Sequence, residues 1–113
     1  MKYDVVIIGA GPAGIFTALE LVRNGSDKKI LMVEKGKPVD KRHCPKAETG
    51  KCMNCKPNCM ITTGFSGAGA FSDGKLSLSC EVGGELPNLI GSEFAQELID
   101  YTDKIYLEFG ADE

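Results

Sequence analysis

The sequence contains no long hydrophobic run. Its two longest uninterrupted apolar segments are Val5–Ile8 and Ile30–Val33. Both are far shorter than the roughly 20 residues that a membrane-spanning helix needs. The pattern of a secretory signal peptide is also absent, because a single base, Lys2, precedes the first segment and glycines follow it directly. We therefore expect a soluble, cytoplasmic protein that makes no contact with a membrane.

Basic side chains are scarce in the C-terminal part of the chain. From Leu76 onward the sequence has nine acidic residues and one base, Lys104, which argues against nucleic-acid binding. Residues 35–59 have the opposite bias, with two acids against seven bases: Lys35, Lys37, Lys41, Arg42, Lys46, Lys51 and Lys56. Such a segment faces phosphates, a partner or water, and a solvated loop is the simplest of these interpretations.

The remaining composition is that of one small globular domain. The 113 residues are 42% hydrophobic and 26% charged, which excludes a disordered or collagen-like chain. No internal repeat and no low-complexity tract interrupts the sequence.

The first third of the chain predicts an α/β fold. Residues 3–8 form a short apolar run typical of a buried parallel strand, and a glycine-rich turn follows it. A helix is expected from Pro12 to Asn24-Gly25, and Ile30–Val33 forms the second strand. The result is an incomplete Rossmann-like β-α-β dinucleotide-binding unit with a right-handed crossover.

The rest of the chain is expected to be largely irregular. Residues 35–86 are a Cys/Gly-rich insertion, in which residues 60–63 and 76–79 are the candidates for short strands. Residues 92–109 predict a C-terminal helix, because one apolar stripe runs along it: Ile90, Phe94, Leu98, Tyr101, Ile105 and Phe109. This stripe is expected to pack in the core.

The glycine-rich turn has the spacing Gly9-x-Gly11-x-x-Gly14. Gly9 permits a tight turn, Gly11 lets a pyrophosphate approach the backbone, and Gly14 lets the helix pack closely on the sheet. Glu34 ends the second strand, where its carboxylate can accept hydrogen bonds from ribose hydroxyls and disfavours the 2′-phosphate of NADP. The alternative is an ordinary tight turn with a surface glutamate.

These residues resemble the N-terminus of FAD-dependent oxidoreductases of the glutathione-reductase type. The resemblance rests on residues 3–14 and on Val33-Glu34-Lys35-Gly36. It implies that the turn binds the pyrophosphate of FAD, that Glu34 binds the adenosine ribose, and that two bases lie nearby. The implied cofactor-binding residues are Gly9, Gly11, Pro12, Ala13, Gly14, Glu34, Lys35 and Arg42.

A second glycine cluster spans residues 64–76. Its glycines can expose backbone N–H groups to an anion or let a planar ring lie close, although a flexible connector is the alternative. The run resembles a narrower group, the bacterial uncharacterised FAD-dependent dehydrogenases. That resemblance places Gly67, Ala68 and Gly69 on the flavin side of FAD. Ser72 and Lys75 could then lie near the flavin, but neither is assigned a catalytic role, and a surface position is expected for Lys75.

Four cysteines form a cluster within the basic segment, namely Cys44, Cys52, Cys55 and Cys59. Their spacing suits structural zinc or an iron–sulfur cluster. A Cys52–Cys55 redox pair and reduced, unliganded thiols remain the alternatives. His43 is expected to be loop filler rather than a ligand. Cys80 is expected to be a small buried hydrophobic residue.

Two functions follow from these features. The first is the FAD-binding portion of a flavin-dependent oxidoreductase or dehydrogenase that acts on a small-molecule substrate. The second is a non-catalytic, cysteine-rich metal-binding or interaction module on a Rossmann-like unit. Residues 1–113 lack the third parallel strand and the later Gly-Asp motif implied by the resemblance. We therefore expect this chain to be the N-terminal part of a longer protein. The chain is expected to be inactive by itself, because the catalytic residues lie elsewhere in the longer protein.

Overall fold

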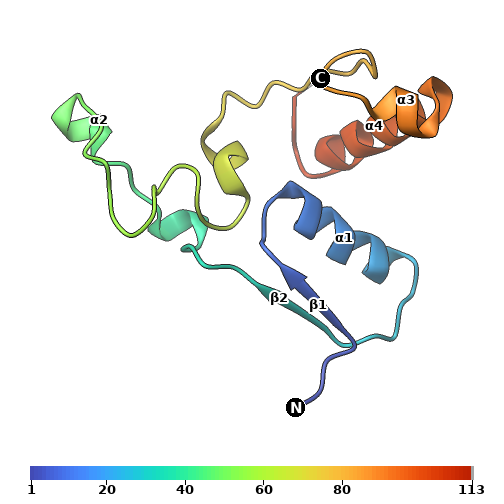
Figure 1. Cartoon of the computed structure of the whole chain (residues 1–113), viewed down its shortest axis with the longest axis horizontal. Coiled ribbons are helices and arrows are strands. Elements are labelled where there is room, and N and C mark those ends of the chain that lie inside the picture. Colours follow the sequence, from blue (N-terminus) through green and yellow to red (C-terminus); the bar gives the residue numbers. More distant parts are fainter. Residues whose placement is uncertain (113) are drawn as a thin grey trace. The chain divides into compact units, whose positions relative to one another are not determined.

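A computed structural model describes residues 1–112. The chain divides into an N-terminal unit, Met1–Ser72, and a C-terminal unit, Asp73–Glu113. The N-terminal unit contains β1 (Val5–Ile8), α1 (Pro12–Arg23) and β2 (Ile30–Val33) in the predicted order (Figure 1). The two strands are parallel, with Val5 opposite Ile30 and Ile8 opposite Val33. The predicted β-α-β unit is therefore present.

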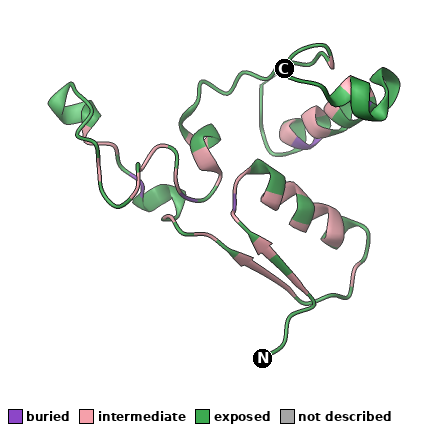
Figure 2. Cartoon of the chain, viewed as in Figure 1, coloured by how far each residue is buried: buried purple, intermediate pink, exposed green. Residues whose placement is uncertain are grey.

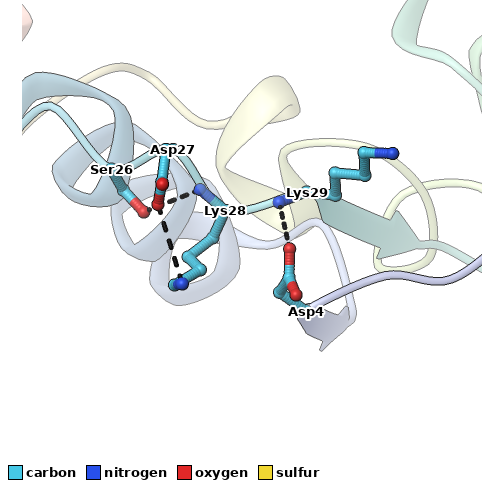
Figure 3. A network of polar contacts seen from close by, with 5 residues as sticks. All are labelled: Asp4, Ser26, Asp27, Lys28 and Lys29. Carbon is cyan, nitrogen blue, oxygen red and sulfur yellow. Dashed lines mark hydrogen bonds and ion pairs between the residues drawn. The ribbon is translucent and has the colours of Figure 1, made fainter.

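Backbone and side-chain bonds fix the register of the two strands where they begin. The backbone N–H of Asp4 donates to the carbonyl of Lys29 at 2.9 Å, and the N–H of Lys29 donates to Asp4 Oδ2 at 2.8 Å. Just before this pair, the N–H of Lys28 donates to Ser26 Oγ at 3.3 Å (Figure 3). A shift of the strand register by one residue would break this reciprocal pair of hydrogen bonds. It would also move the side chains of the shifted strand to the opposite face of the sheet.

β1 differs from the prediction in its burial. The expected strand is buried on both faces, but Val6 and Ile8 are 53% and 81% exposed. Val5 and Ile7 are half-buried, and a Cβ at Gly14 of α1 would lie 3.2 Å from Ile7 Cγ2. Helix α1 therefore covers one face of β1, and the described residues leave Val6 and Ile8 uncovered.

The segment after β2 forms short helices joined by turns. These are η1 (Val39–Lys41), α2 (Lys46–Thr49) and η2 (Gly67–Phe71). The expected strands at residues 60–63 and 76–79 are both wrong. The first is a turn, in which the N–H of Thr63 donates to the carbonyl of Cys59 at 3.0 Å, and the second pairs with no strand in the described part of the chain.

The C-terminal unit is a pair of helices, α3 (Leu86–Ile90) and α4 (Ser92–Glu108). Helix α4 confirms the predicted helix to within one residue, whereas α3 was not predicted. Gly91, at φ +87°, separates the two helices. Ile90 therefore belongs to α3, whereas Phe94, Leu98, Tyr101 and Ile105 of the predicted stripe lie in α4 and Phe109 is its C-cap.

The predicted core stripe of α4 is mostly exposed. Ile105 is 3% exposed, whereas Phe94 and Phe109 are 51% and 75% exposed. In Figure 2 most of α4 has the colours of exposed and intermediate residues. Among the described residues of this unit, those that are buried are Ala95 and Ile105. The expectation of a packed stripe was therefore wrong in this structure, because periodicity predicts the helix but not the surface that covers it.

Gly14 provides a direct test of the packing between α1 and β1. A Cβ at Gly14 would overlap the carbonyl oxygen of Gly9, so Gly14→Ala should lower the unfolding free energy by about 1–3 kcal/mol. Gly11→Ala is the matched control, because its Cβ would meet nothing within 4 Å. Urea unfolding monitored by circular dichroism measures both. Equal stability of the two variants would contradict this packing.

Candidate dinucleotide site

The first glycine turn joins β1 to the N-terminus of α1. Gly9 has φ +98°, a conformation that L side chains rarely adopt, and its N–H donates to the carbonyl of Val33 at 2.7 Å. Gly11 is the N-cap of α1, with Pro12 as the first helical residue and no side-chain cap. The turn therefore leads directly into a helix end that lacks a capping side chain.

That helix end presents free donors. No acceptor in residues 1–112 bonds the backbone N–H groups of Gly11, Ala13 or Gly14. A Cβ at Gly11 would meet nothing within 4 Å, so the space beside its backbone is open. Unpaired amides at the positive end of a helix bind phosphate groups, and open space at Gly11 lets a phosphate approach them.

The carboxylate of Glu34 lies against the same turn. Its Oε2 accepts the N–H of Ala10 at 2.9 Å, and its Oε1 accepts the N–H of Gly36 at 2.8 Å. The hydrogen bond from Ala10, followed by that from Gly36, lowers the pKa of this carboxyl below its ordinary value. A carboxylate has about four lone-pair positions, so the ionised group can still accept bonds from ribose hydroxyls.

The second glycine cluster reaches the first. The N–H of Ser66 donates to the carbonyl of Ala10 at 2.7 Å. A Cβ at Gly67 would lie 3.9 Å from both Gly11 Cα and Pro12 Cδ. Gly67, Ala68 and Gly69 form the start of η2, so the structure brings this segment to the glycine turn rather than leaving it as a free connector.

A second close contact joins residues 36–37, which follow β2, to residues 64–65, which begin the second glycine cluster. Gly64, at φ +137°, forms a bridge with Lys37, and the N–H of Phe65 donates to the Lys37 carbonyl at 3.2 Å. A Cβ at Gly36 would overlap the backbone of Gly64. The two segments therefore meet backbone to backbone, which glycine permits at both positions.

Arg42 does not have the free guanidinium expected of a phosphate ligand. It is 5% exposed and donates to the carbonyls of Met60 at 2.8 Å, Phe65 at 2.7 Å, and Ile61. Its Cζ lies 4.7 Å from the ring centroid of Phe71. The guanidinium of Arg42 is thus buried and bonded to the protein backbone.

The other polar candidates lie at the surface. Lys35 is exposed. Lys75 pairs with Asp73 at 3.2 Å, in agreement with the expected surface position. Ser72 Oγ donates to the Gly69 carbonyl at 3.0 Å, which fixes the end of η2.

The structure does not assemble the predicted metal site. All five cysteines are free thiols, and no group of three or more His, Cys, Asp or Glu side chains in residues 1–112 is placed to hold a metal ion. His43 Nε2 lies 3.0 Å from Glu48 Oε1. Cys80 is half-buried rather than buried, and its N–H donates to Gln96 Oε1 at 3.1 Å.

Cys59 differs from the other cysteines in its electrostatic surroundings. Hydrogen bonds from the backbone of Thr62, then from the backbone of Ile61 and the Thr62 hydroxyl, lower the pKa of its exposed thiol. The spacing of the cysteines gives no indication of this effect, because it depends on the turn at residues 60–63. The residues that create it do not belong to any recognisable motif.

The N-terminal half of the chain is similar to a known protein family. Residues 3–58 match the family model described as pyridine nucleotide-disulphide oxidoreductase. An uncharacterized protein of Clostridium beijerinckii is 44% identical over 77 residues, which cover 68% of this chain and 14% of that protein. The mitochondrial electron transfer flavoprotein-ubiquinone oxidoreductase of Dictyostelium discoideum is 45% identical over 42 residues, 34% of this chain and 7% of that protein. No solved structure matches.

The two-stranded parallel sheet with its connecting helix is consistent with a partial Rossmann-like unit, and residues 3–58 are similar to a family of dinucleotide-binding oxidoreductases. The particular type that the matched segment resembles is the pyridine nucleotide-disulphide oxidoreductase. The chain spans only a small part of the length of both relatives. No helix in residues 1–112 has the length and hydrophobicity needed to cross a membrane.

The lowered pKa of Cys59 predicts a reactivity that depends on Thr62. In Thr62→Val the thiol loses the hydroxyl hydrogen bond but keeps the backbone ones, so the pH midpoint for alkylation of Cys59 should rise. Mass spectrometry after timed iodoacetamide treatment at several pH values measures each thiol. Alkylation of the exposed Cys52 serves as the reference. An unchanged midpoint at Cys59 would contradict the assignment.

Proposed function

We propose that this chain is the FAD-binding portion of a flavin-dependent oxidoreductase or dehydrogenase. The observation that carries the proposal is the free amides of Gly11, Ala13 and Gly14 beside the Glu34 carboxylate. In this assignment the amides bind the pyrophosphate and Glu34 binds the adenosine ribose. FAD, when bound, supplies the capacity to accept and pass on a hydride or electrons.

The fit to FAD rests on the complementary chemistry of the residues present. The open space at Gly11 lets a phosphate approach, and the amides supply donors in a fixed direction. The backbone hydrogen bonds to Glu34 hold its carboxylate ionised and in place. Gly67 lies next to the turn, and Gly67, Ala68 and Gly69 are assigned to the part of FAD beyond the pyrophosphate.

We further propose that residues 1–113 are the N-terminal part of a larger FAD-binding domain. Two findings support this extent: the aligned segment is 14% of the Clostridium protein, and Val6 and Ile8 leave an apolar strand face uncovered. In this assignment the small-molecule substrate and the catalytic residues belong to other parts of the protein. The cysteine cluster has no assigned role in this function.

Gly11 gives the sharpest test of the pyrophosphate assignment. Gly11→Val places a branched side chain in the open space, and FAD affinity should fall by about tenfold or more. Titration of flavin fluorescence with the chain measures the affinity, and circular dichroism checks the fold. Ala47→Val, at an exposed position in α2, adds similar bulk as a control. Unchanged affinity in a folded Gly11→Val variant would contradict the assignment.

In this assignment the glycine turn and Glu34 contact the ADP half of FAD, and this predicts a ligand order. FAD should bind this chain only weakly, ADP should compete with it at a similar concentration, and FMN should not compete because it lacks adenosine. ADP bearing a 2′-phosphate should compete less well than ADP, because the Glu34 carboxylate repels it. Competition titrations measure all four ligands. Tight FAD binding that ADP cannot displace would contradict this division of contacts.

A further inference from the structure

Arg42 is the one charged residue that is buried among residues 1–112. Burial of a guanidinium is costly unless its donors are paired. The side chain meets this requirement with three backbone carbonyls, those of Met60, Ile61 and Phe65, and with the face of the Phe71 ring. Its burial therefore depends on the exact path of residues 60–71.

The contacts of Arg42 close the base of the cysteine loop, defined here as residues 43–59. The chain leaves at Arg42 and returns at Met60 and Ile61, whose carbonyls accept bonds from the same guanidinium. A planar fork can bond carbonyls in several fixed directions and stack on a ring at once, which a lysine ammonium cannot. The loop is thus closed by one side chain, independently of its cysteines.

The same contacts lead directly to the glycine turn. Arg42 holds the carbonyl of Phe65, and the next N–H, of Ser66, donates to the carbonyl of Ala10 at 2.7 Å. The N–H of Ala10 in turn donates to Glu34. A continuous path of backbone and hydrogen bonds therefore links Arg42 to the carboxylate assigned to the ribose.

We infer that Arg42 is a positioning residue for dinucleotide binding, which keeps the segment from Phe65 to Phe71 against the glycine turn. It acts through the geometry of its fork and not through its charge on a phosphate. The inference rests on the proposed function. In this inference, the affinity for the dinucleotide depends on the Arg42 contacts at the base of the cysteine loop as well as on the glycine turn.

The test compares Arg42→Lys with Arg42→Gln in the whole chain. Lysine keeps the charge and loses the fork, whereas glutamine loses both. Each variant should bind ADP and FAD at least about tenfold more weakly, with a salt dependence of affinity like that of the unmodified chain. Lys41→Gln, at the exposed neighbouring position, removes a charge without touching the fork and should leave affinity nearly unchanged.

A second readout needs no ligand. Hydrogen exchange of the Phe65 and Ser66 amides should accelerate in Arg42→Lys, whereas the amides of the β1–β2 ladder should keep their rates. Retained affinity in Arg42→Lys with loss in Arg42→Gln would show a direct charge role and overturn the inference. Unchanged exchange at Phe65 and Ser66 would also overturn it.

Failure of the proposed function has a different signature. In that case the unmodified chain binds neither ADP nor FAD, which removes the role of Arg42 in binding together with the function itself. If the unmodified chain binds and Arg42→Lys binds equally well, only the inference about Arg42 fails.

A milder variant keeps the test decisive if both Arg42 variants fail to fold. Phe71→Leu retains apolar bulk and the hydrogen bonds of Arg42 but removes the aromatic face. Affinity should fall by about two- to fivefold, and exchange at Phe65 and Ser66 should rise modestly. Unchanged affinity and unchanged exchange in this variant would overturn the inference.

Discussion

The peptide groups of Ala10 connect the parts of the candidate site. The N–H of Ala10 donates to Glu34 at the end of β2, and its carbonyl accepts the N–H of Ser66 from the second glycine cluster. Ala10 itself is fully buried. A single residue between two glycines thus links three segments that are distant in sequence. Because both of its polar groups are used, any shift of the turn would leave a buried group unpaired.

The sequence predicted those parts of the fold that are governed by local rules. Parallel apolar strands, a glycine turn and helix boundaries have strong local signals, so β1, α1, β2 and α4 were found close to their true limits. The signals failed where the outcome depends on distant partners. Residues 60–63 have the apolar, β-branched composition of a strand, yet their carbonyls turn to meet Arg42 and they form a turn instead.

The candidate site was predictable to the same degree. The spacing of Gly9, Gly11, Gly14 and Glu34 reports a local geometry that the structure reproduces. The position of Arg42 could not be read in this way, because a basic residue in a basic segment has the same sequence pattern whether it faces solvent, a phosphate or backbone carbonyls. Burial distinguishes these cases: Arg42 and Gly64 are buried, and the neighbouring lysines of the segment are exposed.

The backbone contact between Gly36 and Gly64 has a consequence for how this protein can diverge. This contact and the hydrogen bonds of Arg42 together hold the two ends of the cysteine loop, residues 43–59, close to each other. The conformation of the cysteine loop therefore has little effect on the position of the glycine turn. Insertions, deletions or a complete exchange of its cysteines would cost little chain entropy and would leave the ends where they are.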